Sequence, residues 1–120
     1  MSNSETEISE LGEFGLIRHL TEGIKPVNGS TVLGVGDDAA IMDYGEREVL
    51  ATTDLLLEGI HFDLRYVPLK HLGYKAAVVN FSDIYAMFGT PRQITVSLGI
   101  SSRFTTEHIE KLYSGIRLAC

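Results

Sequence analysis

The sequence is poor in cysteine, tryptophan and basic residues. Cys120 is the single cysteine among 120 residues, so no internal disulfide can form, which fits a reducing compartment. Ten basic residues stand against 16 acidic ones, and a net charge of −6 argues against non-specific binding to nucleic acid or to an anionic membrane. The first ten residues are polar and acidic, unlike a secretory signal, and no apolar run approaches the ~18 residues of a membrane span. We therefore expect a cytoplasmic protein.

Several motifs of known chemistry are also missing. The chain has no GxxxxGK[ST] phosphate-binding loop, no HExxH zinc motif, no EF-hand pattern and no basic patch with interleaved aromatic residues. Cys120 stands at the end of the sequence, where a catalytic nucleophile is not expected. What the chain does have is 44% hydrophobic residues, enough for the core of one domain of this length.

The pattern of apolar and turn-forming residues predicts one α/β (α+β) domain over residues 11–120, after a flexible lead over residues 1–10. Helices are expected from Leu11 to Ile24, after Pro68, and after Thr105 as a capping residue. Extended segments are expected over residues 31–35 continuing through 39–43, over 47–54, and over 92–100. The expected order is therefore helix, strand, strand, helix, strand, helix.

The stretch GVGDDAAIM places Asp37 and Asp38 directly after a glycine turn. Its glycine spacing matches the loose dinucleotide-binding fingerprint, and Asp54 lies about 20 residues further on, as that fingerprint asks. We reject this interpretation because the fingerprint needs a helix after the glycines, whereas the residues here are strand-like. Two carboxylates would also repel a bare pyrophosphate, and a divalent cation would reverse that repulsion. A solvated turn is an equally good interpretation of this motif taken alone.

Two further stretches carry oxygen ligands in apolar surroundings. ATTDLLLEGIHF offers Thr52, Thr53 and Asp54 at the end of a predicted strand, followed by His61. KAAVVNFSDIYAMFG places Asp83 on a predicted helix whose other residues are largely apolar. Each stretch alone also fits a polar edge that meets solvent. Together, acids in a loop, at a strand end and on a helix indicate a magnesium site assembled from several elements.

The three stretches resemble the N-terminal half of the thiamine-monophosphate kinases, which are related to aminoimidazole-ribonucleotide and selenophosphate synthetases. The TTD-x-L-x-x-G-x-HF pattern is specific to the kinases, and GEFGLI (Gly12–Ile17) fits them as well. The resemblance runs from about residue 11 to the end of the sequence. It implies ATP-dependent conversion of thiamine monophosphate to thiamine diphosphate. It also implies a largely antiparallel mixed sheet with helices on one face, paired into a barrel across a homodimer.

The resemblance also implies roles for individual residues. Magnesium ions would be held against the ATP phosphates by Asp38, Thr52, Thr53, Asp54 and Asp83. Asp37 would be either a further ligand or a support for its loop. His61 would contact thiamine monophosphate, and Tyr113 would lie against the nucleotide. Phosphoryl transfer to a phosphate needs alignment and charge neutralisation, so no covalent nucleophile is expected.

Two alternatives remain open from the sequence: a non-catalytic dimerisation and cation-binding module, and a sister enzyme of the same superfamily. The family continues beyond this region with a glycine-rich segment and a second domain, so we expect this chain to carry only the front part of the site. We also expect a sheet that belongs against a partner to leave apolar surface exposed, so that the chain dimerises or aggregates.

Overall fold

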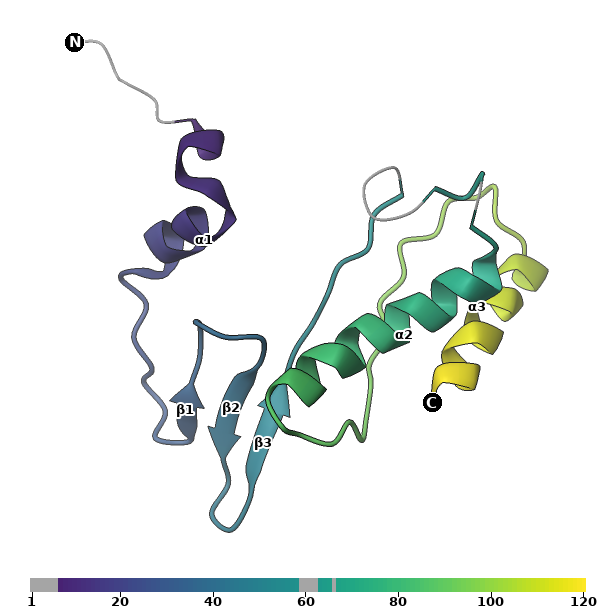
Figure 1. The fold of residues 1–120 in the computed structure, drawn as a ribbon. Helices are drawn as coiled ribbons and strands as arrows, with labels where there is room; N and C mark the ends of the chain where they lie inside the picture. The colour runs from purple at the N-terminus through teal and green to yellow at the C-terminus, as the bar shows by residue number, and fades with distance from the viewer. Residues whose placement is uncertain (1–6, 59–62, 66) are drawn as a thin grey trace.

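The computed structural model describes residues 7–58, 63–65 and 67–120 of the chain, and this part forms three helices and one small sheet (Figure 1). The elements, in chain order, are α1 (Ile8–Thr21), β1 (Thr31–Leu33), β2 (Ala40–Asp43), β3 (Glu48–Ala51), α2 (Leu69–Ala86) and α3 (Thr106–Ala119). Within the described residues, no helix is both long and apolar enough to cross a membrane.

The sheet is antiparallel throughout, in the order β1-β2-β3. The sequence pattern counted residues 31–35 and 39–43 as one extended segment, and this is wrong: they form two strands, and β2 runs back along β1. The chain reverses in the glycine-rich loop, where Gly36 has a φ of 137°, a conformation that L-residues with a side chain rarely adopt. In the β2–β3 pair, Ala40 lies opposite Ala51. The loop therefore ends beside the residues that follow β3.

The strand predicted over residues 92–100 does not form, because none of these residues is paired in a sheet. The alternation of apolar residues that suggested a strand lies in the sequence at Ile94, Val96, Leu98 and Ile100. These four side chains are 40–52% exposed. A strand needs a neighbouring strand to satisfy its backbone groups, and the described part of this chain supplies none here. The only sheet of the described residues is thus purely antiparallel rather than mixed.

Helices α2 and α3 pack against each other and supply most of the core. The buried apolar side chains at this contact are Leu72, Ala77, Leu112 and Ile116. The backbones approach closely at two glycines: a Cβ on Gly73 would collide with the Leu112 carbonyl, and one on Gly115 with the Lys70 carbonyl. This reciprocal pair of glycines sets the distance between the two helices.

The start of α3 is fixed by side chains, as the sequence predicted for Thr105. The Thr105 hydroxyl accepts from the His108 backbone N–H at 3.3 Å, and the Thr105 N–H donates to His108 Nδ1 at 3.1 Å. This capping box satisfies two backbone donors that the first turn would leave unpaired. The backbone amide and the Thr105 hydroxyl lower the pKa of Glu107 in the same turn. His108 is the partner that the sequence pattern did not reveal.

The end of α2 carries a strained residue. The Phe88 N–H donates to the Tyr85 carbonyl and the Gly89 N–H to the Ile84 carbonyl, both at 3.0 Å, which is the Schellman arrangement. The left-handed position of this motif usually holds glycine, but here it is Phe88, with a φ of 62° and a side chain that is 99% exposed. The sequence pointed to Gly89 as the residue that ends the helix, and the turn occurs one residue earlier.

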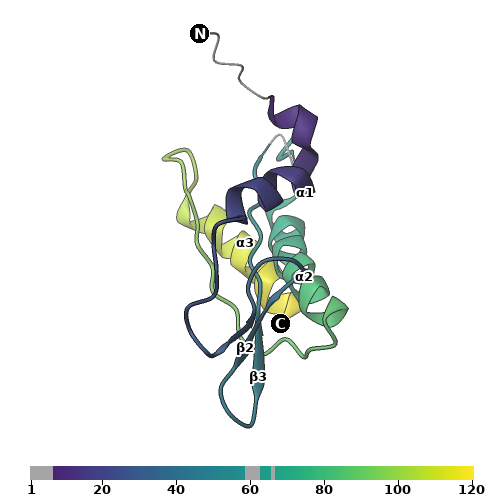
Figure 2. The same cartoon turned by 90° about the vertical axis from the view of Figure 1, so that its left-hand side faces the viewer.

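Helix α1 forms three residues earlier than predicted at both ends, so that residues 8–10, expected in the flexible lead, are helical. It makes no extensive contact with another helix or strand of the described residues. It contains no buried residue, and Phe14 and Leu20 are 76% and 66% exposed. Gly12, with a φ of 69° and a ψ of 179°, breaks it into two helical stretches. Figure 1 shows α1 beyond the β1 side of the sheet, away from α2 and α3, and Figure 2 shows it above the sheet in the view turned by 90°. The radius of gyration is 18.1 Å, against about 14 Å for a compact domain of this length.

We predict that Gly115→Ala destabilises the chain by about 2–3 kcal/mol, because the added methyl group forces α2 and α3 apart. The matched control is Gly23→Ala, where a Cβ meets nothing within 4 Å and φ is not positive. Urea unfolding followed by circular dichroism measures both variants. Equal midpoints for the two variants would mean that the helices do not pack through these glycines.

We predict that Phe88→Gly stabilises the chain by about 0.5–1 kcal/mol. Glycine removes the left-handed strain of about 1–2 kcal/mol and loses part of that gain to its greater freedom in the unfolded chain. The side chain is fully exposed, so its removal costs little packing. Phe88→Ala keeps the Cβ and serves as the control; thermal unfolding should rank glycine above both alanine and phenylalanine. An alanine variant as stable as the glycine variant would contradict the strain argument.

Candidate active site

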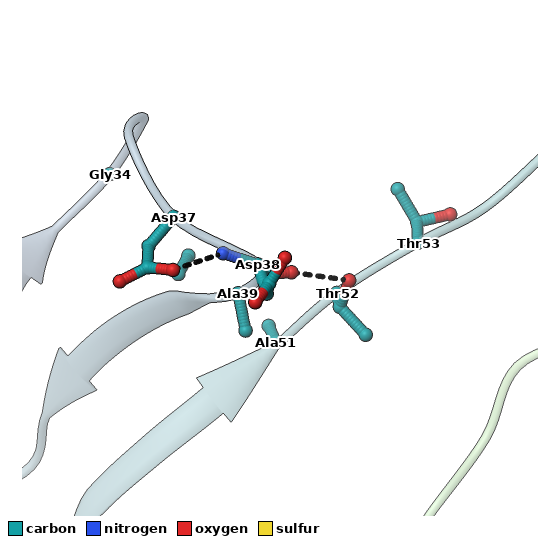
Figure 3. Close-up of a pocket in the computed structure, with 8 residues that line it drawn as sticks. Gly34, Asp37, Asp38, Ala39, Ala51, Thr52 and Thr53 are labelled. Atoms are coloured by element: carbon teal, nitrogen blue, oxygen red, sulfur yellow. Dashed lines mark hydrogen bonds between the residues drawn. The ribbon is translucent and has the colours of Figure 1, made fainter. Parts of the chain in front are cut away.

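A shallow hollow of about 400 Å³ lies where β2 begins and β3 ends (Figure 3). Its size is within the range of small-molecule sites. The residues around it come from the β1–β2 loop and from the chain on both sides of the β3 end, namely Gly34, Asp37, Asp38, Ala39, Ala40, Ala51, Thr52 and Thr53. The β2–β3 pairing, in which Ala40 lies opposite Ala51, is what brings the two segments together. Four of the predicted site residues are among these lining residues.

Two hydrogen bonds fix the loop against the strand end. The Thr52 hydroxyl donates to the Asp38 backbone carbonyl at 3.0 Å, across 14 residues of sequence. The Asp38 backbone N–H donates to Asp37 Oδ1 at 2.8 Å. Figure 3 shows both bonds meeting at the Asp38 backbone. Among residues 7–58, 63–65 and 67–120, no group donates a hydrogen bond to the Asp38 carboxylate itself.

Helix α2 brings Asp83 to the same place. Asp83 Oδ2 lies 3.5 Å from the Thr52 hydroxyl, at the outer limit of hydrogen-bonding distance. Asn80, which shares a helix face with Asp83 in the sequence pattern, donates instead to the Ala76 carbonyl of its own helix at 2.8 Å. Thr52 therefore connects the loop acid Asp38 to the helix acid Asp83.

Three predicted residues of the described part of the chain, Asp83 among them, do not line the hollow. Asp54 follows Thr53 along the chain but does not line the hollow. Tyr113 is half-buried on α3 and does not line it either. His61 lies outside the described residues. Within the described residues, no three His, Cys, Asp or Glu side chains come close enough together to hold a metal ion between them.

The lining of the hollow is acidic, and none of its described lining residues is basic. The nearest basic residue along the chain after β3 is Arg65, which pairs with Asp63 at 2.6 Å and lowers the pKa of that carboxyl group. A phosphate in the hollow would meet the charges of Asp37 and Asp38 unless a cation lay between them. Carboxylate and hydroxyl oxygens suit Mg²⁺, which is commonly held by one or two protein carboxylates together with phosphates and water. The donor set of Asp38, Asp83 and the two threonines fits that ion.

The sequence analysis missed the small residues that make the hollow. Ala39 is only 4% exposed, and Ala40 and Ala51 face each other across the β2–β3 pair. Their short side chains leave space beside Asp38 and Thr52. The signal was present as three alanines next to the predicted acids and hydroxyls, but it becomes meaningful only when the strand register is known.

Comparison with known proteins identifies the family. Residues 36–120 match the family model of AIR synthase related proteins, N-terminal domain. A thiamine-monophosphate kinase of Aquifex aeolicus is 40% identical over 113 residues, which are 94% of this chain and 35% of that protein. The thiamine-monophosphate kinase of Bacillus subtilis is 38% identical over 109 residues, which are 88% of this chain and 33% of that protein.

A solved structure gives the same result. AaThiL complexed with AMPPCP and TMP matches with a TM-score of 0.82 and 35% identity, over 98% of this chain and 36% of that chain. This chain thus spans about a third of the length of the relatives it matches. The resemblance seen in the three acidic stretches is confirmed at the level of the family. The chain belongs to the AIR synthase related proteins, with the thiamine-monophosphate kinases among its relatives, and its residues 36–120 match their N-terminal domain.

Proposed function

We propose that this chain supplies the N-terminal part of an enzyme that transfers the γ-phosphoryl group of ATP to the phosphate of thiamine monophosphate. The products are thiamine diphosphate and ADP, and the reaction takes place in the cytoplasm. The observation that carries the proposal is the hollow at Asp38, Thr52 and Thr53, in a chain that matches a structure complexed with AMPPCP and TMP. AMPPCP is an analogue of ATP, which supports ATP as the phosphoryl donor.

Asp38, Thr52, Thr53, Asp54 and Asp83 are the residues that we propose as magnesium ligands. Magnesium, when bound, would neutralise the negative charge of the phosphates during transfer. The protein's contribution is to hold the Asp38 backbone carbonyl and the Asp83 carboxylate against the Thr52 hydroxyl. The acidic lining of the hollow gives a bare nucleotide no partner of opposite charge, which makes binding dependent on the cation.

The transfer itself is proposed to be direct and in line, without a covalent enzyme intermediate. The acceptor is a phosphate that is largely deprotonated at neutral pH, so no strong general base is needed. The lining residues Asp38, Thr52 and Thr53 are suited to aligning phosphates and excluding misdirected attack rather than to bond formation. His61, which lies outside the described residues, is proposed to contact thiamine monophosphate, and Tyr113 to contact the nucleotide.

We also propose that the enzyme is a homodimer whose N-terminal sheets pair into a barrel. The segment over residues 92–100 supports this, because it is extended, unpaired and alternately apolar. A second copy would supply the neighbouring strand that the described part of this chain lacks, and would bury the exposed face of Ile94, Val96, Leu98 and Ile100.

Nucleotide binding tests the proposed site directly. Isothermal titration of AMPPCP into the chain should give binding in the presence of Mg²⁺ and none without it. Asp38→Asn removes a proposed ligand and should weaken the magnesium-dependent binding at least about tenfold. Glu48→Gln is the charge-matched control, because Glu48 lies at the opposite end of β3 from the hollow, and its affinity should equal that of the wild type.

Two results would contradict the proposed site. Binding that is equally strong without Mg²⁺ would show that the acidic hollow does not receive the phosphates. The same loss in Asp38→Asn and Glu48→Gln would mean that only the overall charge matters. A transfer assay with thiamine monophosphate and ATP, in a protein of the relatives' full length, tests the reaction itself, and formation of thiamine diphosphate is the expected result.

The homodimer predicts a mass in solution of twice the 13.2 kDa of the chain. Val96→Lys places a charge on the apolar face of the 92–100 segment and should convert the dimer to monomer. Ser97→Lys adds the same charge on the opposite face of the alternation and should leave the dimer intact. Size-exclusion chromatography with light scattering measures all three proteins. A monomeric wild type, or a dimer that Val96→Lys leaves intact, would rule out pairing through this segment.

A further inference from the structure

The peptide backbone at Asp38 is held from both sides. Its N–H is bound by the Asp37 carboxylate at 2.8 Å, and its C=O is bound by the Thr52 hydroxyl at 3.0 Å. A residue whose N–H and C=O are both fixed has little freedom to turn its side chain by moving the backbone. The Asp38 carboxylate receives no hydrogen bond from the described part of the chain and lines the hollow. The two adjacent aspartates therefore differ in what they do, although both are exposed acids.

Asp37 also lines the hollow, but its carboxylate is engaged with the backbone of the next residue. Its Oδ1 is occupied by the Asp38 N–H. In Figure 3 its other carboxylate oxygen points away from Asp38 and Thr52. Gly36, with its φ of 137°, sets the loop direction immediately before Asp37 and thereby directs this side chain back onto the following peptide. A hydrogen bond to a carboxylate is stronger than one to a neutral acceptor, which suits a clamp on an exposed loop.

We propose that Asp37 is a positioning residue and not a magnesium ligand: it fixes the Asp38 peptide so that the Asp38 carboxylate faces the hollow. The magnesium part of this inference rests on the proposed function, whereas the clamp on the peptide does not. The essential property of Asp37 is then an acceptor oxygen at Oδ1. Its negative charge contributes only a screened, longer-range attraction to a cation.

The chain contains a matched control for this clamp. Asp43 Oδ1 accepts from the Gly45 backbone N–H at 2.9 Å, in the turn between β2 and β3 at the other end of the sheet. It is the same type of bond, from an exposed aspartate to a backbone amide in a tight turn, but it lies outside the residues that line the hollow. Loss of either bond should cost similar stability, so only their effects on the site should differ.

The experiment compares Asp37→Asn, Asp37→Ala and Asp43→Ala with the wild-type chain. Asparagine keeps an Oδ1 acceptor and removes the charge, whereas alanine removes both. The first readout is the amide proton shift of residue 38 in two-dimensional NMR, recorded without metal or nucleotide. The second is the affinity for AMPPCP with Mg²⁺, measured by titration at low salt and at about 0.5 M salt, where exposed charges more than a few ångströms apart are screened.

The proposal predicts that Asp37→Asn, which keeps a weaker hydrogen bond, leaves the residue 38 amide closer to its wild-type shift than Asp37→Ala does and stays within about threefold of the wild-type affinity at high salt. Asp37→Ala should shift that amide upfield and weaken binding by about tenfold, in the range seen when groups that orient metal ligands are removed. Asp43→Ala should leave both readouts unchanged. Equal losses of affinity in Asp37→Asn and Asp37→Ala would overturn the proposal and make Asp37 a ligand.

The experiment distinguishes a failure of the proposed nucleotide site from a failure of the Asp37 clamp. A wild-type chain that binds no nucleotide at any magnesium concentration contradicts the proposed site, and the amide shift then still decides whether Asp37 clamps residue 38. An amide shift that Asp37→Ala leaves unchanged overturns the clamp, whatever the affinities. A chain whose amide shifts change throughout in Asp37→Ala, but not in Asp43→Ala, would mean that Asp37 supports the whole sheet and not one peptide.

Discussion

The arrangement of the site depends on the hydrogen bond from the Thr52 hydroxyl to the Asp38 carbonyl. This bond joins the β1–β2 loop to the end of β3, which the β2–β3 pairing places beside that loop. Without it, the loop would be tied to the sheet end only through the β2–β3 register. With it, the Asp38 carboxylate, the Thr52 hydroxyl and Asp83 of α2 come together, although 45 residues separate the two acids in the sequence.

Local signals predicted the three helices well. Thr105 begins α3 through its own side chain, and Pro68 precedes α2, because capping and proline geometry act within a few residues. The strand over residues 92–100 could not be predicted in the same way, because pairing depends on a neighbour and not on alternation alone. The reversal at Gly36 was missed because a glycine can continue a strand or turn it, and the sequence does not distinguish the two.

The sequence named residues that lie near one another in the candidate site, but it did not reveal which of them contact each other. Asp37, Asp38, Thr52 and Thr53 do line one hollow, whereas Asp54 and Tyr113 do not. The alanines beside them escaped notice because space is a property of facing positions across a register. The different orientations of Asp37 and Asp38 were also beyond sequence reasoning, since adjacent identical residues carry no sign of which one turns back on the backbone.

The core of this chain is small, and much of its apolar surface is left for further protein to cover. Few side chains are buried outside the α2–α3 contact, α1 makes no extensive contact with another described helix or strand, and the chain is more extended than a compact domain of its length. The relatives are about three times as long, so their additional chain is one source of cover, and the proposed second copy is another. The hollow at Asp38 has a wide opening because the described residues that line it come only from one end of the sheet.

The central claim is that a metal-bound nucleotide lies at the Asp38–Thr52 end of the sheet. Titration of the chain with Mn²⁺ and AMPPCP, followed by paramagnetic broadening of backbone amide signals, tests this most directly. The account predicts that broadening begins at residues 36–39 and 52–54 and reaches the Asp83 turn of α2 next. Broadening that begins instead at the acidic turn around Asp43, or spreads evenly over all exposed acids, would contradict it.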